Sequence, residues 1–387
     1  MNICFITSEY KGYTKTGGIA SALDALVPEL IKLKNNIIIV TRSDKNSRIT
    51  KSDNLTIYPV VTKGIWAVFN FPYLISKILP KIIKKESIDV IETTLTRFPS
   101  LMVLHKIKNT PLVLRIYTSL STLLGGSSLK KKANKFINYW GEKYNLLKAD
   151  SLSIASHASF ERILEYYKLS KNNIKCPVKL IPIGIPIEKN HIPKTQAKQF
   201  ITKRLGTKLS NKILVTYLGA MHYHKGIDLI IKTAEWFEVH NHKLHFILIG
   251  RGDPCQFSDN NKLPGNCTYV GPIEEKEKRW FLRGSNIILI PSRWESFGIV
   301  SIEAMNQKIP LIAGNAGGLK EIVEDGISGW LINHTTKDVI DAIEKIISMP
   351  NEELDKVIET AWEHFQTNFD IEKTAQKTLD LYKELIK

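Results

Sequence analysis

Short apolar runs alternate with segments of helical periodicity along the whole chain, and this alternation restricts the fold more than any other feature. Each run has the length of a strand, and unbroken apolar runs are typical of parallel strands covered by helices on both faces. The pattern therefore predicts doubly wound, parallel α/β sheets. The runs are ICFIT, NIIIVT, LTIYPVV, DVIET, PLVLRIY, SLSIA and VKLIPI, then ILVTYLG, HFILIG, CTYVG, NIILI and PLIAG.

Two domains fit the chain length of 387 residues, which is long for a single hydrophobic core. A polar stretch rich in Lys, Thr and Gln, residues 189–211, separates the two series of runs and predicts a linker. We therefore expect a first domain over residues 1–188 and a second over residues 212–365. From Ala361 onward, apolar residues recur at helical spacing, which predicts a helical C-terminus.

The net charge of +16 is unevenly placed, because residues 1–208 carry +21 and residues 209–387 carry −5. Nucleic acid, an anionic membrane or an acidic acceptor would each suit the basic half, and so would a solvated lysine-rich surface without a partner. No apolar stretch reaches the roughly 18 residues of a membrane span. The start, MNICFITSEY, lacks the features of a signal peptide. Four cysteines without C-x-x-C spacing predict reduced thiols in a cytoplasmic protein, with no zinc site.

One basic segment, Gly64–Lys85, combines aromatic residues with lysines. Pro72 and Pro80 predict that it is interrupted and does not form one long helix. Such a segment could lie on an anionic bilayer surface, although a core-packed helix with solvated lysines is the more frequent arrangement. A second cluster, Lys130–Lys132 with Lys135, favours the membrane interpretation slightly, and residues 121–128 between the two are expected to form a mobile loop.

The stretch PSRWESFGIVSIE places two carboxylates, Glu295 and Glu303, on either side of a helix start, with seven residues between them. We expect a helix over Ile299–Met305, preceded by a turn at Phe297-Gly298. A helix start offers unpaired N–H groups and the positive end of the helix dipole, which suit a phosphate. On spacing alone, a strand–loop–helix unit with two solvated glutamates is the simpler interpretation.

Other candidate ligand-binding positions also follow strands, where open α/β sheets bind ligands. Gly17-Gly18 precedes a helix and lets a ligand approach the backbone closely, although it is equally an ordinary turn. Lys225 stands directly before a helix, and Arg251 lies in a glycine turn. Gly317-Gly318 likewise stands between the end of a strand and the start of a helix. His222 and His224 are interpreted as loop histidines, since no carboxylate or cysteine accompanies them at metal-ligand spacing.

In this order and spacing, the segments YLGAMHYHKGIDLII, LIGRGDP, PSRWESFGIVSIEAM and GGLKEIVEDGISGWLI resemble the retaining glycosyltransferases of family 4. The resemblance spans most of the chain and is strongest in the second half. It implies the GT-B fold, with two facing Rossmann-like domains and a C-terminal helix, residues 366–387, that crosses back to the first domain. It also implies that a nucleotide-diphosphate sugar binds mainly to the second domain, and a glycan or lipid-linked acceptor mainly to the basic first domain.

The resemblance further implies roles for individual residues. Glu303 would hydrogen-bond the ribose hydroxyls, and Glu295 the hydroxyls of the donor sugar. Lys225 would neutralise the diphosphate and stabilise it as the leaving group. Tyr117 occupies the place of a histidine that many relatives carry near the reacting sugar. Around the diphosphate we expect Gly17 and Gly18, with backbone N–H groups from Phe297, Gly298, Ile299 and Val300. Arg251 is a further donor-binding residue, in a loop expected to contact the base.

The expected activity is therefore metal-independent, retaining transfer of a hexose in cell-surface polysaccharide synthesis, such as lipopolysaccharide or capsule, with no cofactor. The expected location is the cytoplasm, including the inner face of the plasma membrane. The sequence departs from the family pattern at Ala220, where many relatives have Arg, at Tyr117, and at Pro182-Ile183-Gly184, where most read PNG.

Alternatives are a nucleotide-sugar epimerase of the same fold and a basic nucleic-acid-binding protein. An NAD-dependent oxidoreductase is disfavoured, because no G-x-G-x-x-G follows the first strand.

Overall fold

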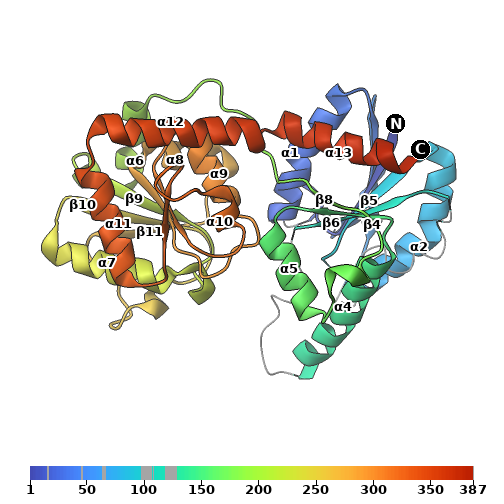
Figure 1. Ribbon diagram of the computed structural model, residues 1–387, viewed down its shortest axis with the longest axis horizontal. Helices are drawn as coiled ribbons and strands as arrows, with labels where there is room; N and C mark the ends of the chain where they lie inside the picture. The colour runs from blue at the N-terminus through green and yellow to red at the C-terminus, as the bar shows by residue number, and fades with distance from the viewer. Residues whose placement is uncertain are drawn as a thin grey trace. The chain divides into compact units, whose positions relative to one another are not determined.

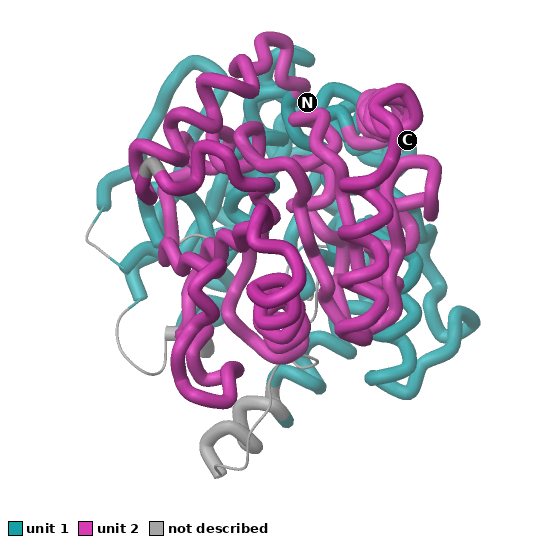
Figure 2. Tube along the Cα trace, turned by 90° about the vertical axis from the view of Figure 1, so that its left-hand side faces the viewer, with its two compact units in different colours: residues 1–186, 370–387 teal, residues 187–369 magenta. Residues whose placement is uncertain are grey.

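A computed structural model of the chain describes residues 1–14, 17–44, 47–62, 67–96, 107, 109–117 and 129–386 (Figure 1). These residues form two compact units, coloured separately in Figure 2. Unit 1 comprises Met1–Pro186 together with Asp370–Lys387, and unit 2 comprises Ile187–Phe369. Among the described residues, no helix is both long enough and apolar enough to cross a membrane.

Unit 1 is built on a sheet with the strand order β3-β4-β2-β1-β5-β6-β7-β8. Neighbouring strands are parallel except β3 and β4, which form an antiparallel hairpin across the two-residue turn Asp53-Asn54. This edge hairpin departs from the wholly parallel sheet that the sequence predicts. The strands are β1 (Asn2–Thr7), β2 (Asn36–Ser43), β3 (Thr50–Ser52), β4 (Leu55–Val61), β5 (Val90–Thr94), β6 (Leu112–Ile116), β7 (Ser151–Ile154) and β8 (Val178–Leu180).

Helices cover both faces of this sheet because its central strands are apolar on both sides. In β1, Ile3 and Phe5 pack in one core with α1 (Gly18–Lys32) and α13 (Ile371–Ile386). Cys4 and Ile6 point to the opposite face. The helices of that second core are α2 (Ala67–Glu86), α4 (Leu129–Lys148) and α5 (His157–Tyr166), and the 3₁₀ turn η1 (Lys171–Asn173) follows α5.

The prediction that proline interrupts the Gly64–Lys85 segment is wrong, because α2 runs through both Pro72 and Pro80. An interior proline removes a helical hydrogen bond and costs about 3 kcal/mol. Four apolar side chains at helical spacing oppose that cost by being almost completely buried on the sheet: Phe71, Ile75, Leu79 and Ile82. Residues 64–66 of this segment, and the loop expected at residues 121–128, lie outside the described residues.

Unit 2 contains a parallel sheet with the strand order β11-β10-β9-β12-β13-β14. Helices α7 (Ile227–His240) and α11 (Thr336–Ser348) pack on one face. On the other face, α8 (Glu275–Gly284) and α9 (Ile299–Asn306) contact β9 and β12, while α6 (Lys194–Leu205) and α12 (Asn351–Asn368) pack on α8 and α9 respectively. The strands are β9 (Ile213–Leu218), β10 (Leu244–Ile249), β11 (Cys267–Gly271), β12 (Ile287–Ile290), β13 (Leu311–Gly314) and β14 (Trp330–Ile332); the short helices are η2 (Thr207–Leu209), η3 (Tyr223–Lys225), η4 (Cys255–Phe257) and α10 (Leu319–Ile322).

The stretch expected to be a linker, residues 189–211, instead carries helix α6 and the turn η2 within unit 2. Its polar composition conceals two apolar positions, Ala197 and Ile201, that are completely buried. A Cβ atom added to Gly284 of α8 would lie 2.9 Å from the Ala197 carbonyl oxygen, so the two helices approach closely. A helix with few apolar residues is thus held by close packing against a glycine.

The C-terminal helical region is divided between the units (Figure 1). Helix α12 belongs to unit 2 and ends at Asn368, whereas α13 begins at Ile371 and belongs to unit 1. Between them, Ile371 N–H donates to the Ile185 carbonyl at 3.1 Å, which attaches α13 to the end of the first unit's main segment. The return of the C-terminal helix to the first domain is therefore confirmed.

Candidate functional site

The strand order of unit 2 reverses between β9 and β12, which lie side by side in the sheet. The helix that follows β9 is α7, and the helix that follows β12 is α9, so the two loops diverge from this point. Such a switch point leaves a crevice at the carboxyl ends of the strands, where open α/β sheets bind ligands. The first loop contains Lys225 and the second contains Glu295, so the fold brings these two predicted site residues to one place.

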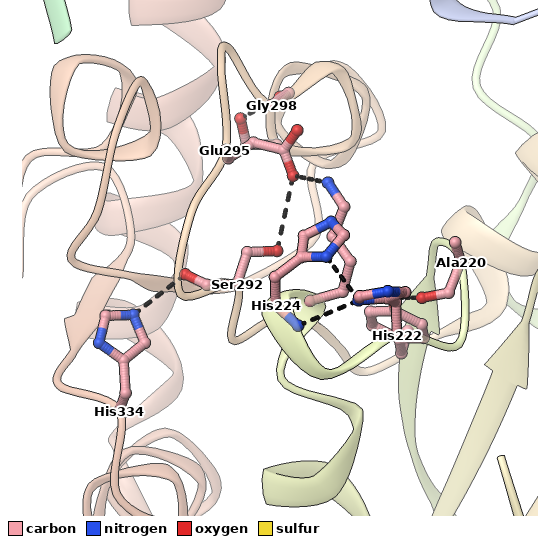
Figure 3. A network of polar contacts seen from close by, with 10 residues as sticks. Ala220, His222, His224, Ser292, Glu295, Gly298 and His334 are labelled. Carbon is pink, nitrogen blue, oxygen red and sulfur yellow. Dashed lines mark hydrogen bonds and ion pairs between the residues drawn. The ribbon is translucent and has the colours of Figure 1, made fainter. Parts of the chain in front are cut away.

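Lys225 and Glu295 form an ion pair across these loops, with 2.5 Å between Nζ and Oε2. Both side chains are largely buried, and the Ser292 hydroxyl lies 3.5 Å from the same carboxylate oxygen (Figure 3). Backbone contacts hold the loops together: Arg293 N–H donates to the His224 carbonyl at 2.8 Å. The pair therefore neutralises two charges in a site that faces the sheet's carboxyl edge.

Two glycines in left-handed conformations allow the loops to interlock. Gly226 has a φ of 75°, and a Cβ atom there would lie 2.1 Å from the Pro291 carbonyl oxygen. Gly317 has a φ of 56°, and its Cβ atom would lie 2.1 Å from the Glu295 carbonyl oxygen. Only glycine fits both the backbone angle and the space. The Gly317-Gly318 turn thus supports the backbone that carries Glu295.

Helix α9 begins directly after this loop, and Gly298 is its N-cap with a φ of 105°. Because Gly298 has no side chain to cap the helix, the first N–H groups depend on other acceptors. Ser301 N–H donates to the Gly298 carbonyl, but among the described residues no acceptor is assigned to the N–H groups of Ile299 and Val300. Phe297 is buried and packs edge-on against Phe369, which fixes the turn. The expected helix over Ile299–Met305 is confirmed.

Glu303 lies on α9 with its side chain only 11% exposed. Its Oε1 atom is 2.5 Å from Lys278 Nζ of α8, whereas its Oε2 atom is buried and has no hydrogen-bond partner among the residues that the structure describes. Burial raises the pKa of the Glu303 carboxyl, and Lys278 opposes that shift. A buried carboxylate oxygen without a partner is a strong acceptor that a ligand hydroxyl could satisfy.

Sequence reasoning missed three charged residues of this region. Arg293 makes a two-point ion pair with Asp228, at 2.7 Å for each contact, and its guanidinium lies 3.9 Å from the Tyr223 ring centroid. These contacts fasten the Lys225 loop to the Glu295 loop. Lys278 is the third, and no local pattern in the sequence indicates its contact with Glu303, since 25 residues separate them.

The predicted donor-binding residue Arg251 is exposed, and its carbonyl accepts from Met221 N–H at 2.7 Å.

The remaining predicted site residues belong to unit 1, at the carboxyl ends of its strands. Gly17 and Gly18 are exposed at the start of α1, and Gly17 provides no side-chain cap. Tyr117 follows β6 and is only 8% exposed. Burial raises the pKa of its phenol well above the ordinary value, while nearby Arg115 partly opposes the shift. A neutral Tyr117 hydroxyl is thus the form present at physiological pH.

A cavity of about 640 Å³ opens at the other end of the unit 2 strands, where β10 and β11 begin. It is lined by Lys208, Lys212, His242, His245 and Thr268, among others. It shares no residue with the Lys225, Glu295 and Glu303 group, so the cavity is separate from the strand-end site.

Comparison with known proteins agrees with this geometry. Residues 198–364 match the family described as glycosyl transferases group 1, a range that contains every unit 2 residue of the site. These residues form a glycosyl transferases group 1 domain. The matched range begins within α6, so part of the stretch expected to be a linker belongs to the group 1 domain.

A curated relative of the chain is an uncharacterized 41.2 kDa protein in the cps region of Klebsiella pneumoniae, 34% identical over 122 residues. That match covers 32% of this chain and 33% of the relative. A second relative, an uncharacterized glycosyltransferase of Methanocaldococcus jannaschii, is 32% identical over 44% of this chain and 47% of its own length. The matched stretches therefore span less than half of either relative.

Solved structures resemble the whole chain. Sucrose-phosphate synthase from Thermosynechococcus elongatus matches with a TM-score of 0.80 and 20% identity, covering 99% of this chain and 98% of the other. At these identities the likeness establishes the fold, and the chain has the GT-B fold of two Rossmann-like units. The GT-B fold that the sequence resemblance implies is therefore confirmed.

Ala220, where the sequence departs from the family pattern, lies in the loop that follows β9. Ala220 is exposed, and its carbonyl accepts from the Tyr217 hydroxyl at 2.7 Å. His222 and His224 stand beside it, with 2.6 Å between their Nδ1 atoms (Figure 3). The loop therefore carries a hydrogen-bonded histidine pair beside Ala220.

Proposed function

We propose that this protein transfers a sugar from a nucleotide-diphosphate sugar to a glycan or lipid-linked acceptor, without a metal ion and with retention of the anomeric configuration. The observation that carries the proposal is the grouping of three features at the unit 2 switch point. They are the paired cation Lys225, the N–H groups of Ile299 and Val300 without an assigned acceptor, and the unpartnered carboxylate oxygen of Glu303. A diphosphate suits a cation and free N–H groups at a helix start, and the hydroxyls of a ribose suit a carboxylate oxygen.

Donor binding would rearrange the Lys225–Glu295 pair. A diphosphate at the start of α9 competes with the Glu295 carboxylate for the Lys225 ammonium. Glu295 would then be free to accept hydrogen bonds from the sugar hydroxyls. In the unliganded protein, Lys225 and Glu295 therefore neutralise each other, and donor binding would separate them.

The reaction breaks the bond between the anomeric carbon and the diphosphate oxygen and forms a bond from that carbon to an acceptor oxygen. Negative charge grows on the leaving diphosphate, where Lys225 and the α9 dipole stabilise it. In retaining transfer by attack from the same face, the acceptor hydroxyl gives its proton to the departing phosphate oxygen. Tyr117 is assigned to the acceptor side of the reaction in unit 1.

We assign the transfer to cell-surface polysaccharide synthesis at the inner face of the plasma membrane. Support comes from the relative in the Klebsiella cps region and from the +21 charge of residues 1–208. Helix α4 adds an exposed aromatic pair, Phe136 at 66% and Trp140 at 54% exposure, with ring centroids 6.3 Å apart. Lys148 at the end of the same helix is exposed, and the sequence of the helix begins with further lysines at 130–132 and 135.

The nucleotide of the donor is proposed from a structural neighbour. A structure of Anabaena HepE in complex with UDP and glucose matches the chain with a TM-score of 0.74 and 16% identity over 99% of this chain and 100% of the other. UDP is therefore the first nucleotide to test, and glucose the first sugar.

The test measures nucleoside diphosphate released from UDP-, GDP- and ADP-sugars in the presence of membrane extract. Release by the wild type, lost in Glu303→Ala and Lys225→Ala, supports the proposal. The matched controls are Glu274→Ala and Lys276→Ala, which remove an exposed ion pair of α8 and should retain turnover. Conversion of the donor sugar without acceptor would instead favour the epimerase.

A further inference from the structure

Lys278 connects helix α8 to the predicted ribose-binding carboxylate. Its Nζ atom lies 2.5 Å from Glu303 Oε1 and 2.7 Å from Glu275 Oε1. The lysine is three-quarters buried, whereas Glu275 is exposed. Neither Lys278 nor Glu275 belongs to the motifs that identify the family resemblance.

The two oxygens of Glu303 have different surroundings. Oε1 contacts Lys278, and Oε2 is buried without a hydrogen-bond partner in the described part of the chain. The charged groups acting on this carboxyl are Lys278 and Glu275, both from α8 among the described residues. Burial raises the pKa of Glu303, Lys278 lowers it, and Glu275 raises it slightly. Lys278 is therefore the group that favours the ionised form.

We propose that Lys278 is a positioning residue that keeps Glu303 ionised and fixes its rotamer, so that Oε2 accepts hydrogen bonds from the ribose hydroxyls of the donor. This inference rests on the proposed function. It assigns Lys278 no contact with the donor, because its ammonium is already held by two carboxylates.

The ionised state matters because a ribose presents hydroxyl donors. A carboxylate accepts through both oxygens, whereas a protonated carboxyl loses acceptor capacity and strength. Without Lys278, the buried Glu303 would take up a proton more readily. Nucleotide binding would then weaken at low pH and recover as the pH rises and the carboxylate re-forms.

The experiment titrates UDP and 2′,3′-dideoxy-UDP into the full chain by calorimetry, at intervals from about pH 5.5 to about pH 8.5. If GDP or ADP raises the melting temperature of the wild type more than UDP does, that nucleotide and its dideoxy form are used. The variants are Lys278→Gln, Lys278→Arg and, as the matched control, Lys276→Gln. Lys276 lies on the same helix, and its exposed ion pair with Glu274 does not reach Glu303.

We expect Lys278→Gln to bind UDP about tenfold more weakly than the wild type at the lowest pH, with recovery toward alkaline pH. The preference for UDP over the dideoxy form should shrink in parallel. Lys278→Arg should restore both the preference and the pH profile, and Lys276→Gln should match the wild type.

Two results would overturn the inference alone while leaving the proposed function intact. One is wild-type binding of UDP in Lys278→Gln at every pH. The other is an equal loss for both nucleotides at every pH, which would mean direct attraction of the phosphates by Lys278. If the wild type binds none of the three nucleotides, the proposed function itself fails, and the inference fails with it.

Discussion

The Lys225 ammonium and the Glu295 carboxylate neutralise each other across the switch point of unit 2, at a separation of 2.5 Å. Their loops follow adjacent strands, β9 and β12, and meet because Gly226 packs on the Pro291 carbonyl. The site is thus arranged before a ligand arrives, and its two charged groups hold each other.

Removal of the Lys225 charge and removal of the Glu295 charge should have different effects on nucleotide affinity. Lys225→Ala leaves Glu295 without its cation beside an incoming diphosphate, so we expect nucleotide affinity to fall by about tenfold or more. Glu295→Gln leaves Lys225 free for the phosphates, so affinity for the nucleoside diphosphate should be retained or rise while sugar turnover falls. Calorimetry with UDP together with turnover of the UDP-sugar separates these effects. Equal losses of affinity in both variants would contradict the exchange of partners.

The Gly317 turn should be required for the position of Glu295. Gly317→Ala places a methyl group 2.1 Å from the Glu295 carbonyl oxygen in a backbone with a φ of 56°. Gly326→Ala is the matched control, with a φ of 73° and no atom of the described residues within 4 Å of the added methyl group. Each change carries a backbone cost of about 1 kcal/mol, so only the contact differs. We expect turnover to fall sharply in Gly317→Ala, with a larger loss of thermal stability than in Gly326→Ala, where turnover should be retained. Equal turnover in the two variants would refute the supporting role.

A buried ion pair in unit 1 should hold the C-terminal helix. Arg115 donates to both oxygens of Glu92, at 2.7 and 3.0 Å, and the Tyr382 hydroxyl of α13 donates to Glu92 at 2.6 Å. Arg115→Met leaves the buried Glu92 carboxylate without its cation, so we expect a loss of about 3–5 kcal/mol in unfolding free energy. Tyr382→Phe should lose about 1.5–3 kcal/mol, because it removes one hydrogen bond to a charged group. Urea unfolding measures both losses, and an unchanged midpoint in Arg115→Met would exclude this anchoring.

Stability should also depend on His245. Burial and nearby Lys212 lower the pKa of His245 to about 4, and its Nε2 atom lies 2.8 Å from the Thr268 hydroxyl. In the unfolded chain this histidine binds a proton near pH 6.5, so the unfolded state holds more protons between about pH 4 and about pH 6.5. Stability contributed by the neutral histidine should therefore fall as the pH falls through that window, by up to about 1.4 kcal/mol per pH unit. Unfolding measured against pH should lose this slope in His245→Asn; an identical slope would contradict it.

The α4 face should bind anionic bilayers. Replacement of Phe136 and Trp140 by Ala removes the exposed aromatic pair, so we expect sedimentation with phosphatidylglycerol vesicles to fall by about tenfold. High salt should weaken wild-type binding, because the lysines contribute through screened charges. Val239→Ala is the control, since Val239 is exposed in unit 2. Wild-type protein that remains in the supernatant would count against membrane association.

The strands were predictable because buried parallel strands leave unbroken apolar runs in the sequence, as IILI does before the Glu295 loop. Pro72 and Pro80 misled the prediction of α2, because local proline rules do not include the burial of Phe71 and Leu79. Helix α6 was hidden for a related reason, as close packing on Gly284 replaces the apolar face that periodicity would reveal.

The site was predictable to the extent that its residues stand directly after strands. Glu295, Lys225 and Gly317 follow that rule, and parallel strands bring their loops to one edge. Lys278 does not, because it lies near the start of α8 and reaches Glu303 only through the packing of two helices. Likewise, the pairing of Arg293 with Asp228 depends on tertiary structure that no local spacing encodes.

The central claim is that the unit 2 switch point holds the nucleotide diphosphate of a sugar donor. The most direct test is calorimetric titration of UDP, GDP and ADP into the wild type, Lys225→Ala and Glu303→Ala. We predict that one nucleotide binds the wild type at one site per chain, and that each substitution weakens it by about tenfold or more. Absence of binding to the wild type, or undiminished binding to both variants, would contradict the claim.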